Sequence, residues 1–284
     1  MSCAPSLVAE YVQPTASKST AQVYGAATSR FVTSFVCSFG LCSHFVSFDP
    51  HGLVIFPTLG NVLLTDADIK ASNILSEIED ESILAEFEAA EANSPSANAI
   101  RDDRTIYASR KLGLPKTFGP PVLCDFGVAR FEDEVNNEDI QPEVYRAPEV
   151  ILEMDWSYPV DIWNVGVMIW DLFQDKHIFN GRDPTGKYSN RYHLAEMVAY
   201  MGPPPIDFLH HSEESWSYFD KQGNLLDPPD MPASLSLESS EENLEGRRKE
   251  LFLQFMRKML QWVPEDRQSA AELLHDPWLN DEMD

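Results

Sequence analysis

The chain has 284 residues, of which 43% are hydrophobic, so it is long and apolar enough to bury the core of one large or two ordinary domains. Acidic residues number 46 against 21 basic ones, a formal net charge of -25. This charge disfavours direct binding to nucleic acid or to an anionic membrane surface. It favours a basic protein partner, although acidic loops that only keep the protein in solution would give the same composition.

The four cysteines show neither metal-ligand spacing nor the dense framework of small secreted domains. We therefore expect a reducing intracellular setting, cytoplasmic or nuclear. Residues 31–48 are nearly uncharged and superficially resemble a membrane span. Their serines and threonines, their glycine and their histidine argue against a span or a signal peptide. The sequence gives no prediction of oligomeric state.

Asp68-Ile69-Lys70-Ala71-Ser72-Asn73 places a carboxylate, an ammonium group and an amide within one short segment. A carboxylate can accept a proton from a nucleophile, a cation can stabilise developing negative charge, and an amide oxygen can bind a hard metal ion. The spacing of these three residues resembles that of the catalytic loop of protein kinases, so the segment is a candidate catalytic loop. The alternative is an Asp-rich turn without chemistry.

Residues 77–92 predict an acidic surface helix, because Ile83 and Phe87 recur at helical spacing among glutamates. Residues 93–121 predict a loop that contains a short strand at 105–107. Residues 122–124 then predict a short buried strand that ends at Asp125.

Residues 160–173 are apolar on nearly every side, which predicts a helix buried in the centre of a domain. A second helix begins near His193 and ends at Gly202, before a proline run. Amphipathic patterns predict closing helices over 250–260 and 269–274, and residues 280–284 form an acidic tail.

Three motifs follow the candidate catalytic loop in a fixed order: Asp125-Phe126-Gly127, Tyr145-Arg146-Ala147-Pro148-Glu149 and Asp161-x-Trp163-x-x-Gly166. This order resembles that of protein kinases, where the motifs form the magnesium loop, the end of the activation segment and a central helix. The resemblance implies an α+β, protein-kinase-like fold. Residues 62–279 would form the mainly α-helical large lobe, with insertions at about 76–121 and 201–244.

The resemblance also implies roles for individual residues. Asp68 would accept the proton of the substrate hydroxyl, Lys70 would steady the transferring phosphoryl group, and Asn73 and Asp125 would bind Mg²⁺ beside ATP. Glu149 would form a buried ion pair with Arg267, which is a stabilising role. Asp161 would either accept hydrogen bonds from the catalytic loop or cap its own helix.

Two departures from the family accompany these matches. Asp66 and Ala67 stand where kinases usually have histidine and arginine before the catalytic aspartate. Residues 128–144 contain no serine or threonine and are rich in acidic residues, so we predict an activation segment that needs no phosphorylation.

Residues 1–61 do not match the kinase small lobe. They contain no Gly-x-Gly to close over phosphates, and Lys18 is the only lysine before the catalytic loop. No glutamate lies between Lys18 and Glu77, so the lysine–glutamate pair cannot form in the family's order. We predict a truncated or replaced small lobe, which a misassembled gene model or an alternative product would explain. The alternative is a genuine, very short small lobe. No residue that binds the nucleotide base can be named.

Within the kinases, the likeness narrows to the fungal members of the SR-protein kinase group. It rests on Asp139-Ile-Gln-Pro142, the run from Tyr145 to Leu152, Trp163-Asn-Val-Gly166 and His193-Leu-Ala-Glu196. The resemblance implies transfer of the ATP γ-phosphate to serines of basic, Arg/Ser-rich proteins. The alternative is a catalytically inactive, pseudokinase-like module or fragment that binds basic proteins.

Overall fold

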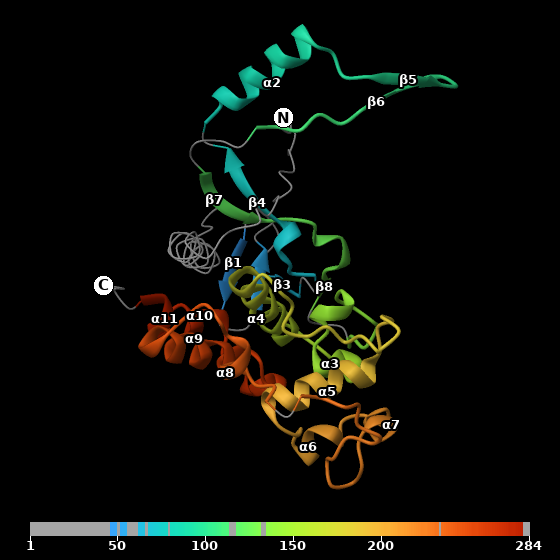
Figure 1. Cartoon of the computed structure of the whole chain (residues 1–284), viewed down its shortest axis with the longest axis vertical. Helices are drawn as coiled ribbons and strands as arrows, with labels where there is room; N and C mark the ends of the chain where they lie inside the picture. Colours follow the sequence, from blue (N-terminus) through green and yellow to red (C-terminus); the bar gives the residue numbers. More distant parts are fainter. Residues whose placement is uncertain are drawn as a thin grey trace. The chain divides into compact units, whose positions relative to one another are not determined.

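The computed structural model describes residues 46–49, 52–55, 62–65, 68–78, 80–113, 118–131, 135–232 and 234–280 (Figure 1). The described residues fall into two compact units. The first comprises residues 74–124, and the second comprises the described residues up to 73 and those from 125 onward. Except for two short strands, the predicted N-terminal segment 1–61 lies outside the described residues.

The first unit contains a two-stranded antiparallel sheet of β4 (Ile74–Ile78) and β7 (Phe118–Leu123), in which Ile74 pairs with Leu123. The predicted strand at 122–124 is confirmed in part, because β7 begins within the predicted loop and ends before Cys124. Its predicted burial is wrong, because Val122 is 41% exposed. A two-stranded sheet has no central strand, so neither of its strands is enclosed within the sheet.

The predicted acidic helix is present as α2 (Ser82–Asn93), which buries Ile83. It begins five residues later than predicted, because the preceding residues pair with β7 as a strand instead. The predicted loop that follows contains a hairpin of β5 (Asn98–Arg101) and β6 (Arg104–Tyr107), which confirms the short strand at 105–107.

The second unit contains a four-stranded antiparallel sheet in the order β1-β2-β3-β8. The strands are β1 (Val46–Asp49), β2 (Gly52–Ile55), β3 (Val62–Thr65) and β8 (Arg130–Phe131). Thr65 pairs with Arg130. This pairing brings the chain that enters the candidate catalytic loop alongside the chain that follows the Asp-Phe-Gly motif.

The predicted central helix is α4 (Pro159–Gln174), of which 13 of 16 residues are buried. Trp163 and Trp170 are fully buried on it; Trp163 stacks on Phe179, and Trp170 stacks on Phe252 of α9 (Gly246–Met259). The remaining long helix, α5 (Asn190–Met201), ends at Gly202 as predicted, where φ is +79°. Shorter helices complete the unit: α3 (Pro148–Ile151), α6 (Ile206–Leu209), α7 (Ser215–Tyr218), α8 (Leu237–Ser240), α10 (Ala270–Leu273) and α11 (Pro277–Asn280).

A buried ion pair joins the start of α3 to the C-terminal part of the chain, as predicted. Arg267 donates from Nη1 and Nη2 to the two oxygens of Glu149, at 2.6 Å each, and neither side chain is more than 2% exposed. The guanidinium also donates to the carbonyl of Pro159 at the start of α4 and lies over the ring of Trp163. The pair therefore fixes α3, α4 and the turn at 264–267 to one another.

Among the helices that the structure describes, none has both the length and the apolar character needed to cross a membrane.

Candidate active site

The candidate catalytic loop is anchored by Ile69, which is fully buried between two polar neighbours. Burial of the isoleucine leaves the flanking Asp68 and Lys70 partly exposed, at 17% and 30%. Lys70 donates from Nζ to both carboxylate oxygens of Asp68, at 2.8 and 2.7 Å. The ammonium group therefore compensates the charge of the carboxylate directly.

Asn73 closes the loop in the 3-10 turn η1 (Ala71–Asn73). Its side-chain nitrogen donates to the backbone carbonyl and to Oδ2 of Asp68, at 3.0 Å each, and its own amide donates to the carbonyl of Lys70. The structure thus brings three of the four predicted site residues into one hydrogen-bonded group.

Asp125 lies in the turn that enters the 3-10 helix η2 (Phe126–Val128), with φ +68° and ψ +60°. Its side chain is exposed. Gly127 belongs to this turn: a Cβ added there would lie 3.3 Å from Oδ1 of Asp125, closer than ordinary contact distance. The absence of a side chain at Gly127 therefore leaves room for the Asp125 carboxylate.

The donor types of Asn73 and Asp125 fit a magnesium ion, which prefers oxygen ligands and takes only one or two from protein when phosphates supply others. The described residues contain no group of three or more His, Cys, Asp or Glu side chains suited to a metal ion. A magnesium ion held by Asn73 and Asp125 would therefore complete its coordination with oxygens of water or of a phosphate ligand. The assignment of the four site residues stays a prediction.

Sequence reasoning missed a partly buried polar cluster, in which Tyr145 is buried and His177 is exposed. Tyr145 donates from its hydroxyl to Oδ2 of Asp171 at 3.0 Å, and Nδ1 of His177 lies 2.7 Å from the same oxygen. Burial, then the charge of Asp171 and finally that of Asp68, raise the pKa of Tyr145. Burial also raises the pKa of Asp171. The available signal was Asp171 itself, a carboxylate inside the apolar run of α4.

Two acidic residues of the predicted activation segment pair with arginines. Arg146 donates to Asp139 at 2.8 Å, and Arg130 donates to Glu138 at 3.0 Å. Gln141 connects the segment to the core, since its side chain accepts from the amide of Ala147 and donates to the carbonyl of Val160. Residues 132–134 of the same segment lie outside the described residues.

Residues 116–279 match the family model described as the protein kinase domain. The chain belongs to the protein kinase family. This confirms the predicted resemblance and the α+β kinase fold. The matched part of the kinase includes the Asp-Phe-Gly motif, the Glu149–Arg267 pair and the central helix, whereas the candidate catalytic loop precedes it.

Serine/threonine protein kinases of two Aspergillus fumigatus strains are each 51% identical to this kinase over 203 residues, which are 70% of this chain and 51% of the relative. SRSF protein kinase 3 of Mus musculus is 30% identical over 162 residues, which are 56% of this chain and 28% of that protein. The chain thus spans about half the length, or less, of these curated relatives.

A crystal structure of a kinase domain superposes with a TM-score of 0.54 at 26% sequence identity, covering 76% of this chain and 60% of the other. The structural match therefore covers a larger share of this chain than the family model, which matches residues 116–279.

Proposed function

We propose that this protein is a serine/threonine kinase that transfers the γ-phosphate of ATP to serines of Arg/Ser-rich proteins. The observation that carries the proposal is the group of Asp68, Lys70 and Asn73, joined by hydrogen bonds of 2.7 to 3.0 Å in the order that kinases use. We place the activity in the cytoplasm or nucleus, in the regulation of mRNA splicing.

Each of the four site residues has a separate role in the proposed phosphoryl transfer. Asp68 orients the substrate hydroxyl and accepts its proton, while Lys70 stabilises the charge that develops on the transferring group. Asn73 and Asp125 would hold magnesium, which would supply positive charge against the phosphates of ATP. Catalysis of this kind depends on positioning, so the hydrogen bonds from Asn73 to Asp68 contribute by fixing the carboxylate.

Charge and relationship support the choice of substrate. One relative is named an SRSF protein kinase, and the sequence motifs resemble the SR-protein kinase group. An Arg/Ser repeat is a dense cation, and the net charge of -25 attracts such a partner. Because this attraction is between exposed charges, salt should weaken it.

The test is transfer of labelled phosphate from Mg-ATP to an (Arg-Ser) repeat peptide, compared with a (Glu-Ser) peptide of the same length. We expect labelling of the Arg-Ser peptide only. Its KM should rise between about 50 and 300 mM salt, because the Debye length is about 10 Å at 0.1 M and added salt screens the attraction between exposed charges. Asp68→Asn should lower kcat by about 10²- to 10⁴-fold, the usual contribution of a general base. Equal labelling of both peptides would refute the substrate class, and an unchanged rate in Asp68→Asn would refute the catalytic role.

A second candidate function is a binding module for basic proteins without phosphate transfer. It is favoured by the lack of a Gly-x-Gly sequence and of a lysine–glutamate pair before the catalytic loop. Peptide binding and phosphate labelling, measured in wild type and in Asp68→Asn, distinguish the two functions. A binding module would bind the Arg/Ser peptide with the same salt-sensitive affinity in both proteins and would label neither peptide.

A further inference from the structure

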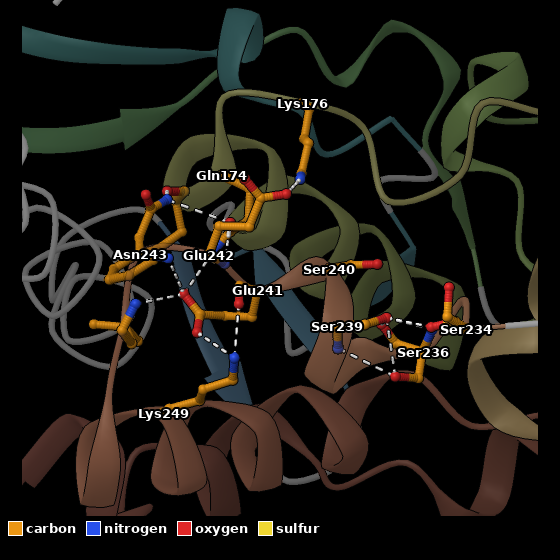
Figure 2. Close-up of polar contacts among 12 residues, drawn as sticks. Gln174, Lys176, Ser234, Ser236, Ser239, Ser240, Glu241, Glu242, Asn243 and Lys249 are labelled. Carbon is orange, nitrogen blue, oxygen red and sulfur yellow. Dashed lines mark hydrogen bonds and ion pairs between the residues drawn. The ribbon is translucent and has the colours of Figure 1, made fainter. Parts of the chain in front are cut away.

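The predicted second insertion ends in a serine- and glutamate-rich segment, Ser234-Leu-Ser-Leu-Glu-Ser-Ser-Glu-Glu-Asn243, which includes the single-turn helix α8. Figure 2 shows its side chains between α9 and the residues that follow α4. Each glutamate has a basic partner from a neighbouring element: Glu238 pairs with Arg257, Glu241 with Lys249, and Glu242 with Lys176. The three pairs differ sharply in exposure.

Glu241 is the fixed point of the segment. Its side chain is fully buried and accepts, at Oε1, from Gln174 at 3.1 Å and from the amides of Asn243 and Leu244 at 2.7 Å (Figure 2). Asn243 in turn donates to the carbonyl of Phe173 at the end of α4. Breaking a buried, hydrogen-bonded carboxylate is costly, so residues 241–244 stay bound to α4.

The other two carboxylates remain available to an approaching protein. Glu238 is 57% exposed and Glu242 is 70% exposed, and their partners are exposed as well. Exposed ion pairs contribute little to stability, so they exchange readily for the cations of another protein. The segment therefore presents two carboxylates, one on either side of Ser239 and Ser240.

Ser239 is the exposed serine that lies immediately after one of these carboxylates and three residues before the other. Its hydroxyl donates to the carbonyl of Ser234 at 2.5 Å and accepts from the amide of Ser236 at 3.0 Å, within the cap of α8 (Figure 2). A helix of one turn opens at low cost, because it has few hydrogen bonds of its own. The hydroxyl can thus leave its cap while Glu241 holds the rest of the segment.

We propose that Ser239 is a phosphorylation site for an acidophilic serine kinase, whose basic groove binds carboxylates on either side of the serine. The Ser239 oxygen attacks the γ-phosphorus of ATP, the bond to the bridging oxygen breaks, ADP leaves, and the hydroxyl proton passes to the base of the modifying kinase. The product carries an added charge of about -1.5 to -2 beside Glu238.

The modification has a local structural consequence. Esterification removes the proton that Ser239 donates to the carbonyl of Ser234, and the new charge repels Glu238 and Glu242 while attracting Arg257 away from Glu238. The cap of α8 should therefore loosen, whereas the contacts of Glu241 do not involve the modified oxygen and should persist.

The experiment uses the full chain, Mg-ATP and casein kinase 2 as the acidophilic probe, with the phosphorylated residue located by mass spectrometry. A reaction without added kinase measures any phosphate that the chain transfers to itself. Ser234 is the matched internal control, because it is exposed but no carboxylate lies within the three residues that follow it. We expect phosphate on Ser239 and none on Ser234, with Ser239→Ala abolishing the modification of this segment.

Glu242→Gln tests the recognition step without disturbing the buried network, since Glu242 is exposed and its pair with Lys176 is weak. We expect labelling to fall at least about tenfold, the effect of a 1.4 kcal/mol change in transition-state binding. Hydrogen exchange on the phosphorylated chain should rise over 234–240 and stay unchanged over 241–244. Phosphate on Ser234 at the same rate as on Ser239, no phosphate on Ser239, or equal labelling in Glu242→Gln would each overturn the proposal.

Discussion

Removal of Arg267 tests how the second unit is held together. In the Arg267→Ala variant the Glu149 carboxylate loses both hydrogen bonds of 2.6 Å while its side chain stays buried at 2% exposure. The carbonyls of Pro159 and Gln261 lose their donors at the same time, and Trp163 loses the cation over its ring. Each of these groups was satisfied by the one guanidinium.

The magnitude follows from the uncompensated charge. Breaking a buried ion pair by removing one partner costs about 3 to 5 kcal/mol. We expect a loss of this size in urea unfolding followed by far-ultraviolet circular dichroism, seen as a lower midpoint at an unchanged slope. Glu149→Gln should cost less, because it leaves a neutral amide beside Arg267 instead of a bare carboxylate.

Arg257→Ala is the matched control, since Arg257 pairs with Glu238 at the surface, where 45% of the arginine side chain is exposed. We expect a loss of about 0 to 1 kcal/mol there. The double variant Glu149→Leu, Arg267→Met should be more stable than Arg267→Ala alone, because no buried charge remains. If Arg267→Ala unfolds at the same urea concentration as Arg257→Ala, the reasoning about the buried pair is wrong.

Three further predictions concern the core around this pair. Gly166→Ala should lower stability by about 1 to 3 kcal/mol in thermal unfolding, because the added Cβ would lie 3.1 Å from Cβ of Met259 and would force α4 and α9 apart. Burial, aided by the charge of Arg146, lowers the pKa of His193 from 6.5 to about 3. Between these two pH values the histidine is protonated in the unfolded chain and neutral in the folded chain. The contribution of His193 to the free energy of unfolding is therefore fully present above pH 6.5 and falls by about 1.4 kcal/mol per pH unit below it. In His193→Phe, the urea midpoint should depend less on pH between pH 6.5 and 5. Tyr145→Phe should cost about 1 to 3 kcal/mol by chemical denaturation, because Asp171 keeps its burial and loses the hydroxyl donor; a gain in stability would refute the importance of that bond.

Several helices of the second unit were predictable because their signals are local. The apolar run of α4, the glycine that ends α5 and the serine before α10 each act within a few residues of the element that they define. The capping box of Ser269 and Glu272 is an example, since both partners lie in one turn.

The strands were harder to predict because their partners are distant in sequence. Residues 77 and 78 resemble the start of an acidic helix, but the pairing of Ile78 with Phe118 places them in β4. The pairing of β1 with β2 was missed altogether, although Asp49-Pro50-His51-Gly52 is a turn-forming sequence. A local sequence pattern cannot predict strand pairing, because the pairing energy depends on residues that are far away in the sequence.

The candidate site divides in the same way. Asp68, Lys70 and Asn73 lie within six residues, so a motif could predict their grouping, and their hydrogen bonds agree with it. The cluster of Tyr145, Asp171 and His177 joins residues up to 32 positions apart in sequence, and only the fold brings them together.

The central claim is that Asn73 and Asp125 hold magnesium for ATP beside Asp68, and the most direct measurement is thermal stabilisation by Mg-ATP. Ligand at one hundred times its dissociation constant should add about 2.7 kcal/mol to the free energy of unfolding. Asp125→Asn should abolish this gain and leave the unliganded protein intact, because the side chain is exposed and asparagine tolerates a φ of +68°. Asp207→Asn, an exposed aspartate on α6, should keep the full gain. Equal stabilisation of wild type and Asp125→Asn would contradict the account.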